Sequence, residues 1–187
     1  MSREGIRIEE YLGKCDRPAI REPLMISEMQ PPLGAAELLI PLRTLCVPWR
    51  QMIIGVDGRN GAGKSSLARY LGWQLGMPVL ETDLWLIRER PLYDELRDLV
   101  LWRHGRNRPV IVEGIELLDT LEKIGLRLDF LIFVTNESQE PEAGLDDDDE
   151  EPPPGTISAR VATYLATYRP QDKADAHLKW REHTNLK

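Results

Sequence analysis

The sequence GRNGAGKS, at Gly58–Ser65, constrains the fold of this chain more than any other feature. It fits the Walker A pattern G-x-x-x-x-G-K-[S/T], with an apolar run (52–56) before it and apolar residues at helical spacing (64–75) after it. Glycines let the backbone curl so that several N–H groups point at one anion, and the N-terminus of the following helix adds partial positive charge. The stretch therefore predicts a phosphate-binding loop between a buried strand and a helix.

Further apolar runs and periodic segments alternate along the chain. Strands are predicted at 52–56, 77–82, 109–114, 128–135 and 174–180, and helices at 64–75, 93–104, 115–124 and 157–168. Strands that alternate with helices form a parallel sheet covered on both faces. We therefore expect an α/β, three-layer P-loop NTPase fold with a five-stranded parallel sheet.

Two segments stand outside this alternation. Residues 1–50 are predicted to form an N-terminal extension with one helical piece at 35–45, which Pro41 should kink or shorten. Residues 51–187 are predicted to form the P-loop domain. Within them, 137–155 carries nine acidic and no basic residues up to Glu151, followed by a proline triplet, so we expect this segment to be mobile.

Composition excludes several classes of protein. The net charge is −7, but it comes from the acidic segment. The chain has no basic stripe of the kind that nucleic-acid-binding domains show. No apolar run approaches the roughly 20 residues that cross a bilayer, and the N-terminus has no apolar core of a secretory signal. Cys15 and Cys46 are far apart and give no metal framework. We expect a cytoplasmic protein that binds neither nucleic acid nor membrane.

The loop chemistry points to ATP with Mg²⁺. Lys64 is expected to contact the β- and γ-phosphates, and the Ser65 hydroxyl to bind Mg²⁺. The expected nucleotide-binding residues are Gly58, Arg59, Asn60, Gly61, Ala62, Gly63, Lys64, Ser65 and Ser66. The chain lacks the N-K-x-D motif of GTPases and the LSGGQ-like signature of transporter ATPases, which leaves the small kinases.

Four stretches resemble the uridine kinase-like family of P-loop kinases, which includes nucleoside, phosphoribulose and pantothenate kinases. They are VDGRNGAGKSSLARYL, PVLETDLWL, RPVIVEGIELL and YLATYRPQDKADAHLKW, and the likeness spans about 52–180. It implies a nucleoside-monophosphate-kinase-like fold. It also implies that Asp83 orients or deprotonates an acceptor hydroxyl and that Glu113 helps to hold Mg²⁺.

The positions of three acidic residues relative to the predicted strands also indicate a ligand site at one edge of the sheet. Asp57, Asp83 and Glu113 come at or just after strand ends, and ligands of parallel sheets bind at the carboxyl ends of strands. The expected metal ligands are Ser65, Asp83 and Glu113, and Asp83 is the candidate base.

Each of these residues also has a structural interpretation. Asp83 can cap the segment that follows it, Glu113 can be a solvated turn residue, and Asp57 can brace the loop through hydrogen bonds. Trp85 is either a core residue or a wall of the acceptor pocket. Trp180 packs against the sheet or against adenine.

The chain departs from the family pattern in two places. Only about 25 residues separate Asp83 from Val110, too few for the family's nucleoside-gripping insertion; basic residues here that can bind an anionic acceptor or simply face solvent are Arg88, Arg90, Arg103, His104 and Arg106. The family's arginine-rich lid, which neutralises charge on the γ-phosphoryl group, is replaced by DDDDEEPPPG. Arg160, on the helix predicted at 157–168, is the preferred substitute, with Arg169 as the second choice.

Two functions follow as hypotheses. The first is an ATP-dependent kinase that phosphorylates a hydroxyl of a nucleoside- or sugar-like small molecule, with Asp83, Lys64 and Arg160 as catalytic residues. The second is a nucleotide-binding regulatory or adaptor protein with a degenerate lid, whose acidic segment binds a protein partner.

Overall fold

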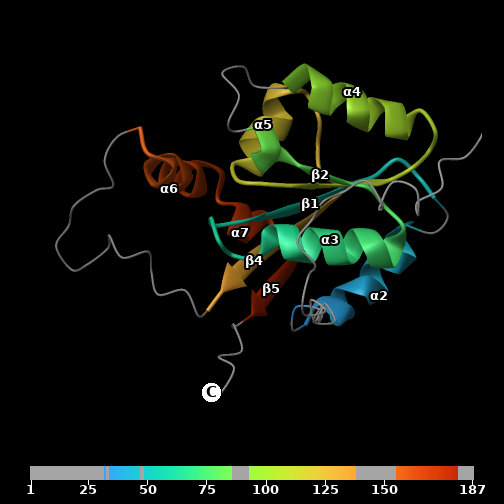
Figure 1. Ribbon diagram of the computed structural model, residues 1–187, viewed down its shortest axis with the longest axis horizontal. Helices are drawn as coiled ribbons and strands as arrows, with labels where there is room; N and C mark the ends of the chain where they lie inside the picture. The colour runs from blue at the N-terminus through green and yellow to red at the C-terminus, as the bar shows by residue number, and fades with distance from the viewer. Residues whose placement is uncertain (1–31, 33, 47–48, 86–92, 138–154, 181–187) are drawn as a thin grey trace, which may run out of the picture. The chain divides into compact units, whose positions relative to one another are not determined.

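The structure is a computed structural model that describes residues 32, 34–46, 49–85, 93–137 and 155–180 (Figure 1). A compact unit spans Pro31–Lys187. The predictions for Arg88 and Arg90 and for the acidic segment fall outside the described residues, apart from Glu137 and Gly155 at the ends of that segment. The side chains of Trp85 and Trp180 lie outside them as well. Those predictions stay predictions.

The described strands form one five-stranded sheet in the order β2-β3-β1-β4-β5, and every neighbouring pair is parallel. The strands are β1 (Ile53–Gly58), β2 (Val79–Glu81), β3 (Val110–Glu113), β4 (Phe130–Asn136) and β5 (Ala176–Trp180). β1 lies in the centre, so the loop that leaves it is flanked by the ends of β3 and β4. The predicted α/β fold with a five-stranded parallel sheet is confirmed.

One helix precedes the first strand, and the other helices lie between successive strands. They are α2 (Ala35–Cys46), α3 (Lys64–Leu75), the 3₁₀ turn η1 (Thr82–Trp85), α4 (Tyr93–His104), α5 (Leu117–Lys123), α6 (Ile157–Tyr168) and α7 (Pro170–Lys173). The predicted bounds of α3, α4 and α6 are confirmed. Among the described residues, none of the helices is long and apolar enough to cross a lipid bilayer.

Two hydrophobic clusters, one on each face of the sheet, make the fold three-layered. In β1, Ile54 and Val56 pack with residues of α2 and α3, whereas Ile53, the residue before Ile54, packs with residues of α4 and α5. Successive side chains of a strand point to opposite faces, which explains this alternation. Burial on both faces also explains why the strands read as continuous apolar runs.

Pro41 does not shorten α2, so of the two expected effects only the kink stays a prediction. The helix continues through it to Cys46, and Pro41 itself is exposed. Leu38 and Leu42, on the opposite side, are buried in the cluster shared with α3. Packing of these leucines therefore outweighs the backbone hydrogen bond that Pro41 cannot make.

The basic residues at the end of α4 lie at the wrong edge of the sheet for an acceptor site. His104 contacts the carbonyl of Met52, which comes just before β1, and Gln51 donates to the His104 carbonyl at 3.0 Å. Arg103 donates to the carbonyl of Pro109, just before β3. The suggestion that Arg103, His104 and Arg106 bind an acceptor beside the loop is wrong, because α4 ends at the amino edge.

Candidate functional site

The phosphate-loop candidate connects the carboxyl end of β1 to the first turn of α3. Gly61 and Gly63 have positive φ angles of 72° and 85°, as the curled loop requires. Gly58 lies so close to β4 that a Cβ atom there would come within 2.4 Å of the Val134 carbonyl oxygen. Gly61 and Gly63 therefore allow the loop to turn, and Gly58 allows it to approach β4 closely.

Lys64 begins α3 and is almost fully buried, with 4% of its surface exposed. Its Nζ donates to the Arg59 carbonyl oxygen at 2.8 Å, across the loop. Burial lowers the pKa of the ammonium, and the nearby Asp83, Glu113 and Asp57 carboxylates oppose that effect. The ammonium is thus enclosed by the loop and surrounded by acidic groups.

Ser65 and Glu113 contact each other at the carboxyl edge. The Ser65 hydroxyl donates to Glu113 Oε1 at 3.0 Å, and Glu113 is fully buried at the end of β3. Burial raises the pKa of Glu113, and the bond from Ser65 opposes this rise. Glu113 Oε2 has no hydrogen-bond partner among the described residues. The interpretation of Glu113 as a solvated turn residue is wrong.

Asp83 lies in η1, at the next strand end. It accepts a hydrogen bond from the Ile115 N–H at 3.3 Å, which ties it to the segment after β3. Its charge also acts on Lys64 and Glu113. Asp83 is partly exposed, whereas Glu113 is buried.

Asp57 is a buried carboxylate with both oxygens engaged. Oδ1 accepts from the Gly58 N–H at 2.7 Å, and Oδ2 accepts from the Tyr164 hydroxyl of α6. Burial raises the pKa of Asp57 to about 6, against the lowering effects of these two bonds and of Lys64. Asp57 therefore braces the start of the loop, as one of the two sequence interpretations expected.

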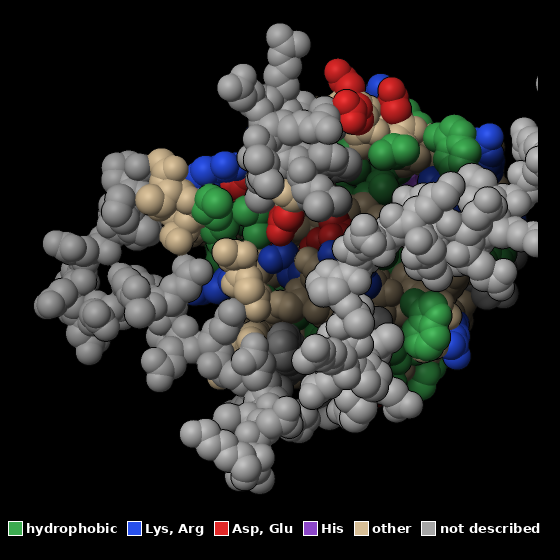
Figure 2. Space-filling view, viewed as in Figure 1, with side chains coloured by type: hydrophobic (Ala, Val, Ile, Leu, Met, Phe, Trp, Pro, Cys, Tyr) green, Lys and Arg blue, Asp and Glu red, His purple; other side chains and the backbone are tan. Residues whose placement is uncertain are grey.

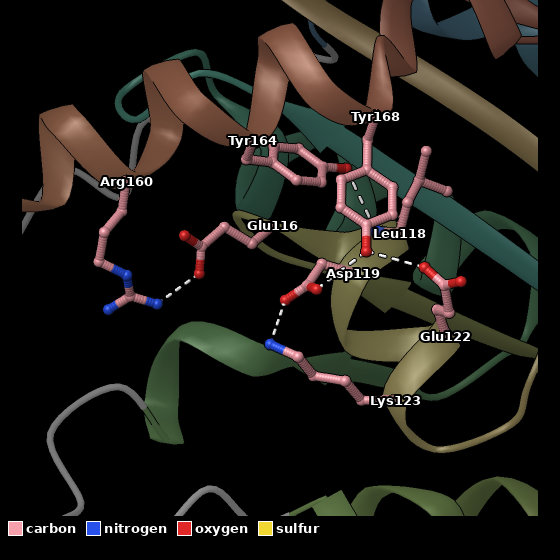
Figure 3. A network of polar contacts seen from close by, with 8 residues as sticks. All are labelled: Glu116, Leu118, Asp119, Glu122, Lys123, Arg160, Tyr164 and Tyr168. Carbon is pink, nitrogen blue, oxygen red and sulfur yellow. Dashed lines mark hydrogen bonds and ion pairs between the residues drawn. The ribbon is translucent and has the colours of Figure 1, made fainter.

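The two candidate lid arginines are both paired with carboxylates. Arg160 forms an ion pair with Glu116, and Arg169 pairs with Asp172 at 2.5 Å, one turn along the chain. Figure 3 shows Arg160 reaching from α6 toward Glu116 at the start of α5. Glu116 has a positive φ of 55°, which is rare outside glycine. Arg160 is thus held close to the end of β3, whereas Arg169 is bound within its own turn.

Sequence reasoning missed Tyr164 and Glu116. Tyr164 is buried at the α5–α6 contact, and its oxygen also accepts from the Leu118 N–H at 3.1 Å. In the sequence it is one apolar-face residue of a helix, which gives no sign of a polar contact. Glu116 reads as an ordinary helix-start residue.

The described residues contain no cluster of three or more His, Cys, Asp and Glu side chains arranged to hold a metal ion. Mg²⁺ does not need one, since it is usually bound through one or two carboxylates together with water and substrate phosphates. The Ser65 hydroxyl and the orphaned Glu113 oxygen fit such a partial ligand set. In the space-filling view, acidic and basic side chains lie next to one another near the middle of the visible face (Figure 2).

No family model and no curated protein matches this chain. Solved structures that are similar to it include a possible uridine kinase from Bacillus stearothermophilus, with 14% identity over 77% of this chain and 96% of that chain and a TM-score of 0.47. The kinase domain of the Escherichia coli tyrosine kinase ETK has 10% identity, covers 83% of this chain and 78% of its own, and has a TM-score of 0.49. Shikimate kinase from Bacteroides thetaiotaomicron has 17% identity over 69% of this chain and 86% of its own, with a TM-score of 0.33. These identities are too low to transfer an activity from those proteins to this chain.

Proposed function

We propose that this protein is an ATP-dependent kinase that transfers the γ-phosphate to a hydroxyl group of a small molecule. The observation that carries the proposal is the pair formed by Ser65 and the buried Glu113, one oxygen of which has no partner among the described residues. A buried carboxylate oxygen without a partner is costly. A ligand that binds beside Ser65 would compensate for that cost.

The residues of the loop account for nucleotide binding. The backbone N–H groups from Gly58 to Ser66 bind phosphate oxygens, and Lys64 exchanges its bond to the Arg59 carbonyl for one to the phosphates. Ser65 and Glu113 hold Mg²⁺, which neutralises charge on the phosphates when bound. Asp83 lies at the carboxyl edge of the sheet, where its side chain is partly exposed.

Phosphoryl transfer depends mainly on positioning and on neutralising charge. Asp83 orients the acceptor hydroxyl and accepts its proton, because a carboxylate at hydrogen-bond reach is sufficient for that role. Arg160, held near the end of β3 by Glu116, neutralises charge on the transferred group. The acceptor is a nucleoside- or sugar-like alcohol, as the resemblance to uridine kinase-like proteins implies.

The first experiment measures binding of Mg·ATP and Mg·ADP by calorimetry. Lys64→Met is expected to abolish binding, whereas the control Lys179→Met, exposed on β5, is expected to leave it unchanged. The second experiment supplies radiolabelled ATP with a panel of nucleosides, sugars and vitamin alcohols. Asp83→Asn should remove transfer, and Asp98→Asn, exposed on α4, should not. Transfer that survives in Asp83→Asn would refute the role given to Asp83.

A second candidate function is a nucleotide-binding regulatory protein. The ion pairs of Arg160 and Arg169 favour it, because both candidate lid arginines are engaged with carboxylates. It predicts tight nucleotide binding without transfer to any acceptor, and loss of a protein partner when 138–154 is replaced by a Gly/Ser linker. Transfer to one member of the acceptor panel would exclude it.

A further inference from the structure

A chain of hydrogen bonds connects helix α6 to the phosphate-loop candidate. The Tyr164 hydroxyl donates to Asp57 Oδ2, and Asp57 Oδ1 accepts from the N–H of Gly58, the first residue of the loop, at 2.7 Å. The same phenol oxygen accepts from the Leu118 N–H at 3.1 Å. Tyr164 therefore joins three elements: the end of β1, the start of α5 and the middle of α6.

Nothing in the proposed chemistry uses Asp57, yet the carboxylate is fully buried. Burying a carboxylate is unfavourable unless hydrogen bonds compensate it. The burial raises the pKa of Asp57 to about 6, and Tyr164 and the Gly58 N–H are the bonds that oppose the rise. A buried pair of this kind, placed at the first residue of the loop, fixes the position of α6 relative to the phosphate site.

Arg160 lies one helical turn before Tyr164 on α6, and both side chains point toward α5 (Figure 3). Arg160 pairs with Glu116, three residues after Glu113. The position of α6 therefore decides where the Arg160 guanidinium stands with respect to the end of β3. The hydroxyl of Tyr164 thus connects α6 directly to Asp57 of β1, the strand that carries the loop.

We propose that Tyr164 is a positioning residue that ties α6 to the end of β1 and so holds Arg160 beside the phosphate site. The inference rests on the proposed function, since it assigns a task to Arg160 at the γ-phosphate. Its consequence is specific. Loss of the phenol oxygen weakens the binding of a nucleotide that has a γ-phosphate more than the binding of one that lacks it.

Tyr168 provides a matched control. It lies one turn further along α6 and also donates from its hydroxyl to carboxylates, Asp119 at 3.0 Å and Glu122 at 2.8 Å. These partners belong to α5, and none belongs to β1 or the loop. Tyr164→Phe and Tyr168→Phe therefore remove the same atom from the same helix, but only the first breaks the connection to the phosphate site.

The test measures the ratio of Mg·ATP to Mg·ADP affinity by calorimetry in the full chain and its variants. The preference for ATP is expected to fall about tenfold in Arg160→Gln and by a similar factor in Tyr164→Phe, since a bond to a charged group is lost. The double variant should show no further loss, because the two residues act as a unit. Tyr168→Phe should keep the preference of the unaltered protein.

Three results would overturn the inference. They are an unchanged preference in Tyr164→Phe, an equal loss in Tyr168→Phe, and full additivity in the double variant. Absence of nucleotide binding in the unaltered protein would overturn the proposed function and the inference together, so the two failures are distinguishable.

A second measurement keeps the inference testable if Tyr164→Phe does not fold. Hydrogen exchange of the unaltered protein should show α6 amides protected together with those of the loop when Mg·ATP is added. Protection of the loop without protection of α6 would refute the coupling.

Discussion

Asp57→Asn should change how the stability of this protein depends on pH. The Asp57 carboxyl is fully buried, and its pKa is raised to about 6 in the folded protein from 3.8. Between these two values the folded state keeps a proton that the unfolded state has lost. The stability gained from the raised pKa is therefore present below about pH 4 and is lost as the pH rises through about 6.

The magnitude follows from the size of the shift. About two pKa units, at about 1.4 kcal/mol per unit, give a loss of about 3 kcal/mol across this window. Asparagine has the same shape and does not titrate. The free energy of unfolding of the unaltered protein, minus that of Asp57→Asn, should therefore fall by about 3 kcal/mol between pH 3 and pH 7.

Urea unfolding of both proteins at closely spaced pH values measures this difference. Other carboxyl groups contribute to each curve and largely cancel in the subtraction. Tyr164→Phe serves as a second perturbation, because it removes a bond that lowers the pKa of Asp57 while leaving the carboxyl buried. The fall should then extend to higher pH. Parallel curves for the unaltered protein and Asp57→Asn would refute the reasoning.

Three further predictions concern packing, one beside the site and two in α2. Gly114→Ala would place a Cβ atom 1.7 Å from Thr82 Oγ1, so we expect about 1–3 kcal/mol of destabilisation in urea melts together with weaker Mg·nucleotide binding. Leu42→Ala, fully buried between α2 and α3, should cost about 2–5 kcal/mol, whereas its neighbour Ile40→Ala, 73% exposed, should stay within about 0.5 kcal/mol. An equal effect of the two would show that α2 does not pack as described. Pro41→Ala should raise the free energy of unfolding by about 1–3 kcal/mol, as it restores a helical N–H at an exposed position, and unchanged unfolding curves would contradict this.

The sequence predicts most of the fold because its signals are local. Glycines mark the loop, periodic apolar residues mark α3, α4 and α6, and continuous apolar runs mark the buried strands. The strand ends are less predictable: β2 stops at Glu81, where Thr82 begins a 3₁₀ turn that no apolar pattern reveals. Pro41 shows the opposite case, in which a strong local rule yields to packing.

The site is predictable only where topology brings strand ends together. Ser65 and Glu113 meet because the loop and the end of β3 share one edge of a parallel sheet. The same topology argues against an acceptor role for the residues at the end of α4, since a crossover helix returns the chain to the amino edge. The hydrogen bond between Tyr164 and Asp57, by contrast, joins residues 107 positions apart in the sequence, and neither residue type predicts it.

Asp57 and Glu113 differ in their hydrogen bonding, and this difference indicates different roles in the site. Both are fully buried carboxylates at the ends of adjacent strands. Both Asp57 oxygens accept hydrogen bonds, whereas Glu113 keeps one oxygen without a partner among the described residues. A buried carboxylate whose two oxygens both accept hydrogen bonds needs no ligand and contributes to structure. A buried carboxylate with an oxygen that lacks a partner destabilises the fold until a ligand binds. Substitution of Asp57 should therefore act first through stability, and substitution of Glu113 through the metal dependence of nucleotide binding.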